Sequence, residues 1–314
     1  MEFLFGPVPS RRLGLSLGIN VIPYKICSYN CVYCEAGKTT KLTVERESFF
    51  DPSKIEREFI ENVNKMGKID VVTFSGGGEP TLNKDLGRLI RFIKDKGFRV
   101  AVLTNGSLMF REDVREDLMD ADVVIPSLDA ALNDSFIKIN RPHGSLRIKR
   151  IIDGLAEFCK DFKGEVWLEV LLAKDLNNSK EDLEALSDAI NKIKPSKVQV
   201  GTVDRPPAES WVEKLSDKEM MDAYVYLAAH TSVEVELIGK FNKENDAFKD
   251  DIERAILKLI NIRPCSEDEL MSIFSLNKDK LNAVLKRFEK EERVYRYTYG
   301  GKQFIAGNVS LVKQ

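Results

Sequence analysis

Short apolar runs rich in β-branched residues alternate with longer amphipathic stretches along most of the chain. The short runs predict strands at 16–22, 69–75, 99–105, 122–128, 166–173, 197–202 and 233–237. Helical spacing of apolar positions predicts helices at 52–64, 84–96, 146–162, 180–193 and 217–230. Compact apolar strands suit a parallel sheet that is buried on both faces. Repeated strand–helix units therefore predict an α/β fold, either a doubly wound sheet or a full or partial barrel, with chemistry at the carboxyl ends of the strands.

The pattern changes after a polar stretch at 241–250, which we interpret as a linker. Beyond it, apolar positions predict three helices, at 251–262, 266–274 and 277–292. Alternating residues at 294–305, around a Gly-Gly pair, predict a β-hairpin. Three helices followed by a hairpin are the outline of a winged helix-turn-helix. The sequence thus predicts a large domain at 1–240 and a small one at 251–314.

The composition narrows the class of protein. The chain has 314 residues, of which 43% are hydrophobic, and its 48 Lys and Arg face 50 Asp and Glu. This apolar content excludes a disordered chain, and no apolar run approaches the roughly 20 residues that a membrane-spanning helix needs. The first residues lack the basic flank and long apolar stretch of a signal peptide, so we expect a cytoplasmic protein without a membrane partner. There are five cysteines, and thiols crowded together in a reducing compartment indicate metal or redox chemistry rather than disulfides.

Three of the cysteines, Cys27, Cys31 and Cys34, follow the spacing C-x3-C-x2-C. No fourth Cys or His lies near enough in the sequence to complete a tetrahedral zinc site. Cubic iron–sulfur clusters normally have four thiolate ligands, so three would leave one iron open to another ligand, as a catalytic cluster requires. Zinc completed by a distant residue, or three reduced thiols, remain alternatives. Cys159 and Cys265 stand alone in the sequence, and we expect them to pack in the interior.

The triplet, with Tyr33 directly before the last cysteine, resembles the signature of the radical S-adenosylmethionine (SAM) superfamily. The resemblance implies a partial (β/α)6 parallel barrel and a [4Fe–4S] cluster on the three cysteines. It also implies that the amino and carboxylate groups of S-adenosylmethionine bind the fourth iron. Members of the superfamily carry a Gly-Gly-Glu segment at the end of the second strand, whose backbone meets the methionine amino group. Here the run 69–75 is followed by Gly76, Gly77, Gly78 and Glu79.

The other candidate cofactor contacts are Tyr33 of the cysteine motif and four polar residues within or at the ends of predicted strands, namely Asn105, Ser127, Asp129 and Glu169. Asn105 ends the third strand of the predicted barrel. Ser127 and Asp129 end the fourth, where the superfamily often places polar residues on the ribose. Glu169 lies inside an apolar strand, which is costly for a charge unless it faces a polar cavity. A solvated strand end or turn is the alternative for each.

The segment before the cysteines, 6–20, and the extended motif at 75–82 resemble a narrower group. These are iron–sulfur oxidoreductases related to the wybutosine-synthesising tRNA enzymes. Arg11 and Arg12 lie in the first segment and could bind a carboxylate or a phosphate, with a surface pair as the alternative. The loop 141–144 carries one of only two histidines and is a candidate for the substrate side.

The resemblance implies an enzyme that takes one electron from an external reductant of flavodoxin or ferredoxin type. Cleavage of S-adenosylmethionine at the cluster then gives methionine and a 5′-deoxyadenosyl radical, which abstracts hydrogen from a substrate. The lack of a second cysteine group argues against an auxiliary cluster. The substrate stays unidentified, with RNA, tRNA or a protein as candidates, and no catalytic residue beyond the cluster is predicted.

The tail at 251–314 carries 12 Lys and Arg against nine Asp and Glu, a weak positive excess. In one hypothesis it binds nucleic acid. The residues in question are Lys278, Lys280, Lys286, Arg287, Arg293, Arg296, Lys302, Tyr295, Tyr297 and Tyr299. In the other hypothesis it packs on the barrel as a structural or dimerising lid. For the whole chain, the alternatives to an enzyme are an iron–sulfur winged-helix regulator that senses redox state and a zinc-stabilised βα binding module.

Overall fold

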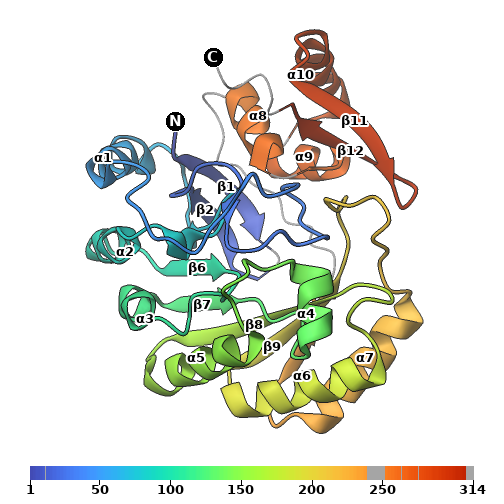
Figure 1. Cartoon of the computed structure of the whole chain (residues 1–314). Coiled ribbons are helices and arrows are strands. Elements are labelled where there is room, and N and C mark those ends of the chain that lie inside the picture. The colour runs from blue at the N-terminus through green and yellow to red at the C-terminus, as the bar shows by residue number, and fades with distance from the viewer. Residues whose placement is uncertain (11, 239–251, 263, 275, 309–314) are drawn as a thin grey trace.

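The computed structural model describes residues 1–10, 12–238, 252–262, 264–274 and 276–308. The predicted linker at 241–250 and Arg11 lie outside the described residues. The chain forms a curved sheet wrapped by helices, with a smaller group of helices and a hairpin beside it (Figure 1). No helix in the described part of the chain is both long and apolar enough to cross a bilayer.

The central sheet has eight strands in the order β1-β2-β5-β6-β7-β8-β9-β10. Only β1 pairs antiparallel, with β2, and the other neighbours are parallel. The bounds are β1 Leu4–Ser10, β2 Gly14–Ile19, β5 Val71–Phe74, β6 Val100–Thr104, β7 Val123–Pro126, β8 Glu165–Leu172, β9 Lys197–Thr202 and β10 Val235–Leu237. Two short strands, β3 Ile26–Cys27 and β4 Lys41–Leu42, pair separately. The predicted α/β fold with a partial parallel barrel is confirmed, and β1 and β10 extend its two edges.

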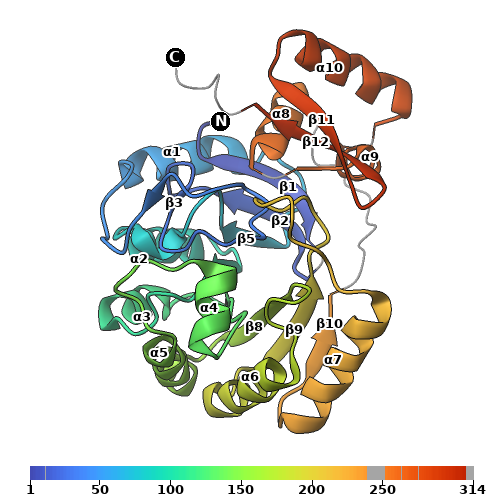
Figure 2. The same ribbon diagram turned by 45° about the vertical axis from the view of Figure 1, so that its right-hand side comes forward.

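Six helices lie on the outer side of the curved sheet (Figure 2). They are α1 Pro52–Val63, α2 Leu86–Asp95, α3 Glu112–Leu118, α5 Ile148–Asp161, α6 Lys180–Ile193 and α7 Asp217–His230. Local sequence explains where several begin. Asp51 caps α1 by accepting a hydrogen bond from the amide of Ser53, and Pro52 occupies the first helical turn. Ser179 and Ser216 begin α6 and α7 with reciprocal capping boxes, so the predicted bounds of both helices are confirmed.

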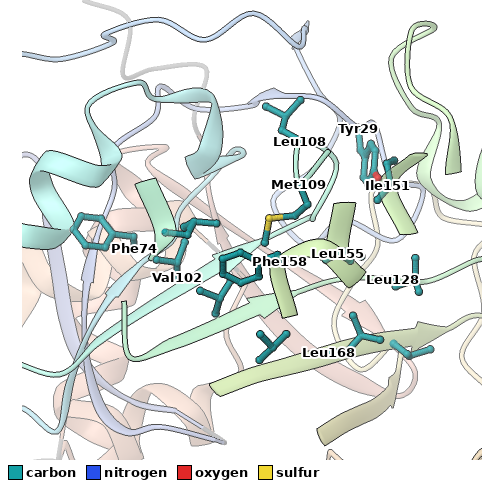
Figure 3. Packing of buried hydrophobic residues seen from close by; sticks show 14 of the residues in the cluster. Tyr29, Phe74, Val102, Leu108, Met109, Leu128, Ile151, Leu155, Phe158 and Leu168 are labelled. Carbon is teal, nitrogen blue, oxygen red and sulfur yellow. The ribbon is translucent and has the colours of Figure 1, made fainter. Parts of the chain in front are cut away.

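Apolar side chains fill both sides of the sheet. Between the sheet and the outer helices, Phe74 and Leu168 belong to one large buried cluster with Phe158 of α5 (Figure 3). A smaller cluster fills the inner side and consists of Leu13, Val71, Ala101, Val123, Ile125 and Trp167.

The inner side of the sheet changes from apolar to polar along the strands. Side chains on one face recur every second residue, so the inward positions after Ile125 and Trp167 are Ser127 and Glu169. The polar positions lie toward the carboxyl ends of the strands. Parallel α/β barrels form their sites at this end.

The tail forms three helices and a hairpin. They are α8 Ile252–Ile262, α9 Glu267–Phe274, α10 Lys278–Lys290, β11 Val294–Tyr299 and β12 Lys302–Gly307. Gly300 and Gly301 both have positive φ, as a two-residue hairpin turn of type I′ requires. A separate apolar cluster joins these elements, and Cys265 is fully buried in it, as expected. The domain bounds and the winged-helix interpretation stay predictions.

The tail contacts the barrel at the loop that follows β9. The guanidinium of Arg205 lies 2.9 Å from the carboxylate of Glu35 and 2.6 Å from that of Glu269 in α9. The hydroxyl of Tyr299 donates to the carbonyl oxygen of Val212 at 3.3 Å. Glu35 directly follows Cys34, so this contact joins the tail to the cysteine loop, by which we mean residues 25–35.

Candidate active site

At the carboxyl ends of the strands, the cysteine loop is hydrogen-bonded to the segment 76–79, which we call the glycine segment. The amide of Lys25 donates to the carbonyl oxygen of Gly77 at 2.8 Å, and the amide of Glu79 donates to that of Ile26 at 3.1 Å. Lys25 and Ile26, which make these bonds, are the two residues before Cys27. The two sequence motifs, 42 or more positions apart in the chain, are therefore adjacent in the structure.

Close packing explains why the segment after β5 consists of glycines. A Cβ at each position would overlap a neighbour: Asn20 at Gly76, Tyr24 at Gly77 and Ile26 at Gly78. The sequence suggested that these glycines let a ligand approach the backbone. Their missing Cβ atoms also admit the cysteine loop itself, because all three neighbours lie between the end of β2 and Cys27.

Each of the three cysteine sulfurs has a side-chain nitrogen within hydrogen-bond distance. Lys25 Nζ lies 3.1 Å from Cys34 Sγ. Two asparagine amides supply the others. The Nδ2 atoms of Asn105 and Asn140 each lie 3.5 Å from a sulfur, of Cys27 and Cys31 respectively. Donors of this kind stabilise thiolates, and they tune the reduction potential of a cluster that those thiolates hold.

Burial opposes these donors at two of the cysteines, because it disfavours the thiolate form. It raises the pKa of Cys27 to about 12, with the nearby Glu79 carboxylate adding to the effect. Burial also raises the pKa of Cys31 well above its usual value, and the charge of Asp129 adds to that shift. Because metals bind thiolates, loading of this site is coupled to the release of protons.

Glu79 is 1% exposed and braces the ends of two strands. Its Oε1 accepts hydrogen bonds from the hydroxyls of Thr81 and Thr104, both at 2.6 Å, and from the amide of Thr81 at 3.0 Å. Its Oε2 accepts from the amide of Asn105 at 2.7 Å. Burial raises the pKa of Glu79, although all four donors favour its charged form. The side chain thus holds Asn105 in place, while a cofactor contact through its backbone stays a prediction.

Asp129 is 2% exposed and, like Glu79, accepts hydrogen bonds from several elements around the site. Its Oδ2 accepts hydrogen bonds from the hydroxyl of Tyr33 at 2.5 Å and from the amide of Asn140 at 2.7 Å. Its Oδ1 accepts from the amide of Leu171 at 3.0 Å. Burial raises its pKa to about 6 against the effect of these donors. Because both carboxylate oxygens are already engaged, we interpret Asp129 as orienting Tyr33 and Asn140, and its predicted ribose contact is left without support from this geometry.

Glu169 faces the inner side of the sheet, where Arg12 neutralises it. Arg12 Nη1 lies 2.5 Å from Glu169 Oε2 and 3.3 Å from Gln199 Oε1. This pair explains how a charge is tolerated in the apolar strand β8. It joins the turn between β1 and β2 to the opposite side of the partial barrel. Ser127 is half-buried and pairs through its backbone with Glu169, so it lies beside this group.

The loop 141–144 lies against the cysteine loop. The amide of His143 donates to the carbonyl oxygen of Ser28 at 2.9 Å. Arg141 has a positive φ of 42° and forms a 2.6 Å ion pair with Glu209. The loop therefore borders the site, although the half-buried imidazole of His143 is bonded to the hydroxyl of Ser145.

Sequence reasoning missed two residues that touch the cysteines. Lys25 precedes the first cysteine by two positions, and this closeness was its only sequence signal. Asn140 ends α4 (Asn133–Asn140), an eight-residue helix that the apolar pattern did not indicate and that lacks a side-chain N-cap. No signal in the sequence links Asn140 to Cys31, 109 positions away.

These residues fit a cubic cluster with three protein ligands. The sulfurs come from one loop, and a donor lies beside each of them. Within the described ranges, no three His, Cys, Asp or Glu side chains are grouped so that they could hold a metal ion together. A cubic cluster does not require such grouping, because each thiolate binds a different iron.

Known proteins resemble this chain along its whole length. The sequence profile of the Radical SAM superfamily matches residues 21–190. The chain is 33% identical to a UPF0026 protein of Methanocaldococcus jannaschii, over 98% of this chain and 97% of that one. It is 38% identical to a protein of Brachyspira hyodysenteriae named GTPase Obg, over 98% of this chain but only 45% of that one. The chain thus spans less than half the length of that relative.

Solved structures share the fold. A radical SAM methyltransferase from Sphaerobacter thermophilus has a TM-score of 0.58 at 16% identity, covering 71% of this chain and 65% of that one. TYW1 with a lysine-pyruvate adduct has a TM-score of 0.54 at 18% identity, covering 77% and 80%. At such identities the likeness concerns the fold alone. The sequence matches carry the assignment: the chain belongs to the radical SAM superfamily, whose enzymes bind a [4Fe–4S] cluster and S-adenosylmethionine.

Proposed function

We propose that this protein cleaves S-adenosylmethionine reductively and uses the product radical to abstract hydrogen from a substrate. When bound, the cluster supplies the electron that breaks the sulfonium bond and releases a 5′-deoxyadenosyl radical. Cys27, Cys31 and Cys34 would hold the cluster. The observation that carries the proposal is the position of these cysteines, each with a nitrogen donor beside it, against the glycine segment.

The chain's own residues would position the reactants. The glycine segment and Asn105 lie next to the cysteine loop, where they can orient the methionine part of the cofactor. Ser127 and the Arg12–Glu169 pair line the inner side of the sheet near the strand ends. We expect the nucleoside and the substrate to bind against this polar inner surface. An external one-electron reductant of flavodoxin or ferredoxin type would complete the system.

The test is anaerobic reconstitution with iron and sulfide, followed by dithionite and S-adenosylmethionine. We expect 5′-deoxyadenosine from the wild type and only background amounts from Cys31→Ala. Cys159→Ala is the matched control, because Cys159 lies on α5 and packs against the core. It should keep both the iron content and the product. Tightly bound zinc with no cleavage in the wild type would refute the proposal and favour the zinc-stabilised binding module.

We also propose RNA as the substrate class, with the tail as its carrier. The supporting observation is a set of exposed lysines along α10, namely Lys280, Lys286 and Lys290. Three similar proteins act on nucleotides according to their names. Two are S-adenosylmethionine-dependent nucleotide dehydratases, 33% and 28% identical over 26% and 54% of this chain. The third is a probable GTP 3′,8-cyclase, 29% identical over 41%.

Other residues of the nucleic-acid hypothesis are engaged within the chain. Arg296 pairs with both Glu267 and Glu289, and the hydroxyl of Tyr299 bonds to the barrel. The proposed contact therefore keeps Lys280 and Lys286 from the predicted set and adds Lys290 of the same helix, which the sequence hypothesis did not include.

Binding of tRNA to the full chain across a salt series tests the RNA proposal. Replacement of Lys280, Lys286 and Lys290 by Gln should weaken binding and flatten the salt dependence by about one unit of slope per lost phosphate contact. The control replaces three exposed barrel lysines, Lys65, Lys163 and Lys180, and should leave binding unchanged. No binding at low ionic strength, or equal loss in both variants, would contradict it.

A further inference from the structure

The donors at the three sulfurs come from separate parts of the chain. Lys25 precedes β3, Asn105 follows β6, and Asn140 ends α4. Each contacts one sulfur, so the arrangement is distributed over all three ligands. Lys25 differs from the asparagines in two ways. It is cationic, and its contact is the shortest, at 3.1 Å against 3.5 Å.

Lys25 is a buried ammonium whose partner is a sulfur. The residue is 3% exposed. Within the described part of the chain, no carboxylate lies at ion-pair distance from its Nζ, and its hydrogen-bond partner is Cys34 Sγ. A buried charge is costly unless it is paired, so the ammonium favours a negatively charged site at the cysteines.

The backbone fixes the position of this ammonium. Lys25 has a φ of 58°, which is uncommon for a residue with a side chain. Its amide donates to the carbonyl oxygen of Gly77 at 2.8 Å, and its own carbonyl oxygen accepts from the amides of Thr40 at 3.0 Å and Lys41 at 3.2 Å. Bonds on both sides of the residue thus hold an unusual conformation, and in that conformation Nζ lies beside Cys34 Sγ.

We propose that Lys25 raises the reduction potential of the cluster by placing a fixed positive charge and an N–H donor on the Cys34 ligand. The inference rests on the proposed function, since it requires the cluster. One-electron reduction takes [4Fe–4S]2+ to [4Fe–4S]+, with the electron supplied by the external reductant and no bond made or broken. The reduced site is one unit more negative, so Lys25 stabilises it more than the oxidised site. Asn105 and Asn140 add neutral donors to the other two ligands.

The experiment is a redox titration of the reconstituted full chain, followed by the electron paramagnetic resonance signal of the reduced cluster. Lys25→Met removes both charge and donor, whereas Lys25→Gln keeps a donor and removes the charge. Lys41→Met is the matched control, because Lys41 lies in the neighbouring strand β4 with a half-exposed side chain paired to Glu47. Iron and sulfide are counted in every variant, so that potentials are compared only between loaded proteins.

We expect Lys25→Met to lower the equilibrium constant for reduction at least tenfold, which is 59 mV for one electron. Lys25→Gln should fall between Lys25→Met and the wild type, and Lys41→Met should match the wild type within twofold. Loaded Lys25 variants with the wild-type potential would overturn this inference and leave the proposed function standing. If Lys25→Met fails to load, Lys25→Gln decides the matter by the same criterion. Failure of the wild type itself to load would overturn both proposals.

Discussion

Two buried carboxylates, Glu79 and Asp129, stand at positions where the sequence suggested direct cofactor contacts. In the structure each carboxylate accepts a hydrogen bond from an asparagine whose side chain contacts a cysteine sulfur. Glu79 accepts from the amide of Asn105, whose side chain reaches Cys27. Asp129 accepts from the side chain of Asn140, which also reaches Cys31. Charged acceptors of this kind orient their donors strongly, so the two carboxylates fix the geometry around the sulfurs.

Gly78 is the residue at which a single methyl group should be felt most. Its Cβ would overlap the backbone oxygen of Ile26, which cannot rotate away as a side chain could. We therefore expect Gly78→Ala to displace the cysteine loop, to lower the free energy of unfolding by about 1–3 kcal/mol, and to reduce the bound iron. Urea unfolding of the apo-protein and iron analysis after reconstitution measure the two effects.

Gly144 provides the matched control for this substitution. A Cβ there has nothing within 4 Å, and the residue does not have a positive φ. Gly144→Ala should change the free energy of unfolding by no more than about 0.5 kcal/mol and leave the iron content intact. Equal stability and equal iron content in both variants would show that the loop tolerates the added methyl group.

At the level of elements, the parallel part of the fold follows from local patterns. The predicted bounds of β9, α6 and α7 agree with the structure, because capped amphipathic helices and compact apolar strands give clear signals. The missed elements lack those signals. In β1 the apolar run is interrupted by Pro7 and Pro9, while α3 and α4 are short and have no side-chain N-cap. Short helices are stabilised mainly by tertiary contacts, which a single sequence does not display.

The candidate site divides in the same way. Its cysteines and glycines have a fixed local spacing, so the sequence indicates both motifs. Their environment comes from far along the chain: Asn105 is 78 positions from Cys27, and Glu169 is 157 positions from Arg12. A polar residue at a strand end has the same sequence signal whether it meets a ligand or braces a neighbour. Only the fold distinguishes these roles, as the engaged oxygens of Asp129 illustrate.

For the molecule as a whole, the loop after β9 connects the barrel, the cysteine loop and the tail. The amide of Glu209 donates to the carbonyl oxygen of Val32 in the cysteine loop at 3.0 Å. Arg205 reaches Glu35 in the same loop and Glu269 in the tail. The tail is thereby linked to the cysteine loop through a few polar contacts, in line with the hypothesis that it packs on the barrel.

Arg205 is the central residue of this link, and its loss should loosen the tail. Its side chain is 12% exposed and its partners Glu35 and Glu269 are 43% and 31% exposed. The pairs therefore lie between a buried network, worth roughly 3–5 kcal/mol when broken, and a surface pair worth less than about 1 kcal/mol. We expect Arg205→Met to lower the local stability of the docked tail by about 2 kcal/mol. Hydrogen exchange in the full chain would then be faster in α9 and β11, while the strands of the barrel keep their protection.

Arg91→Met is the control, because Arg91 forms an exposed 3.5 Å pair with Asp120, and it should leave exchange in the tail unchanged. Unaltered exchange in Arg205→Met would mean that the other contacts hold the tail on the barrel, such as Val8 against the tail cluster and the hydrogen bond from Tyr299 to Val212.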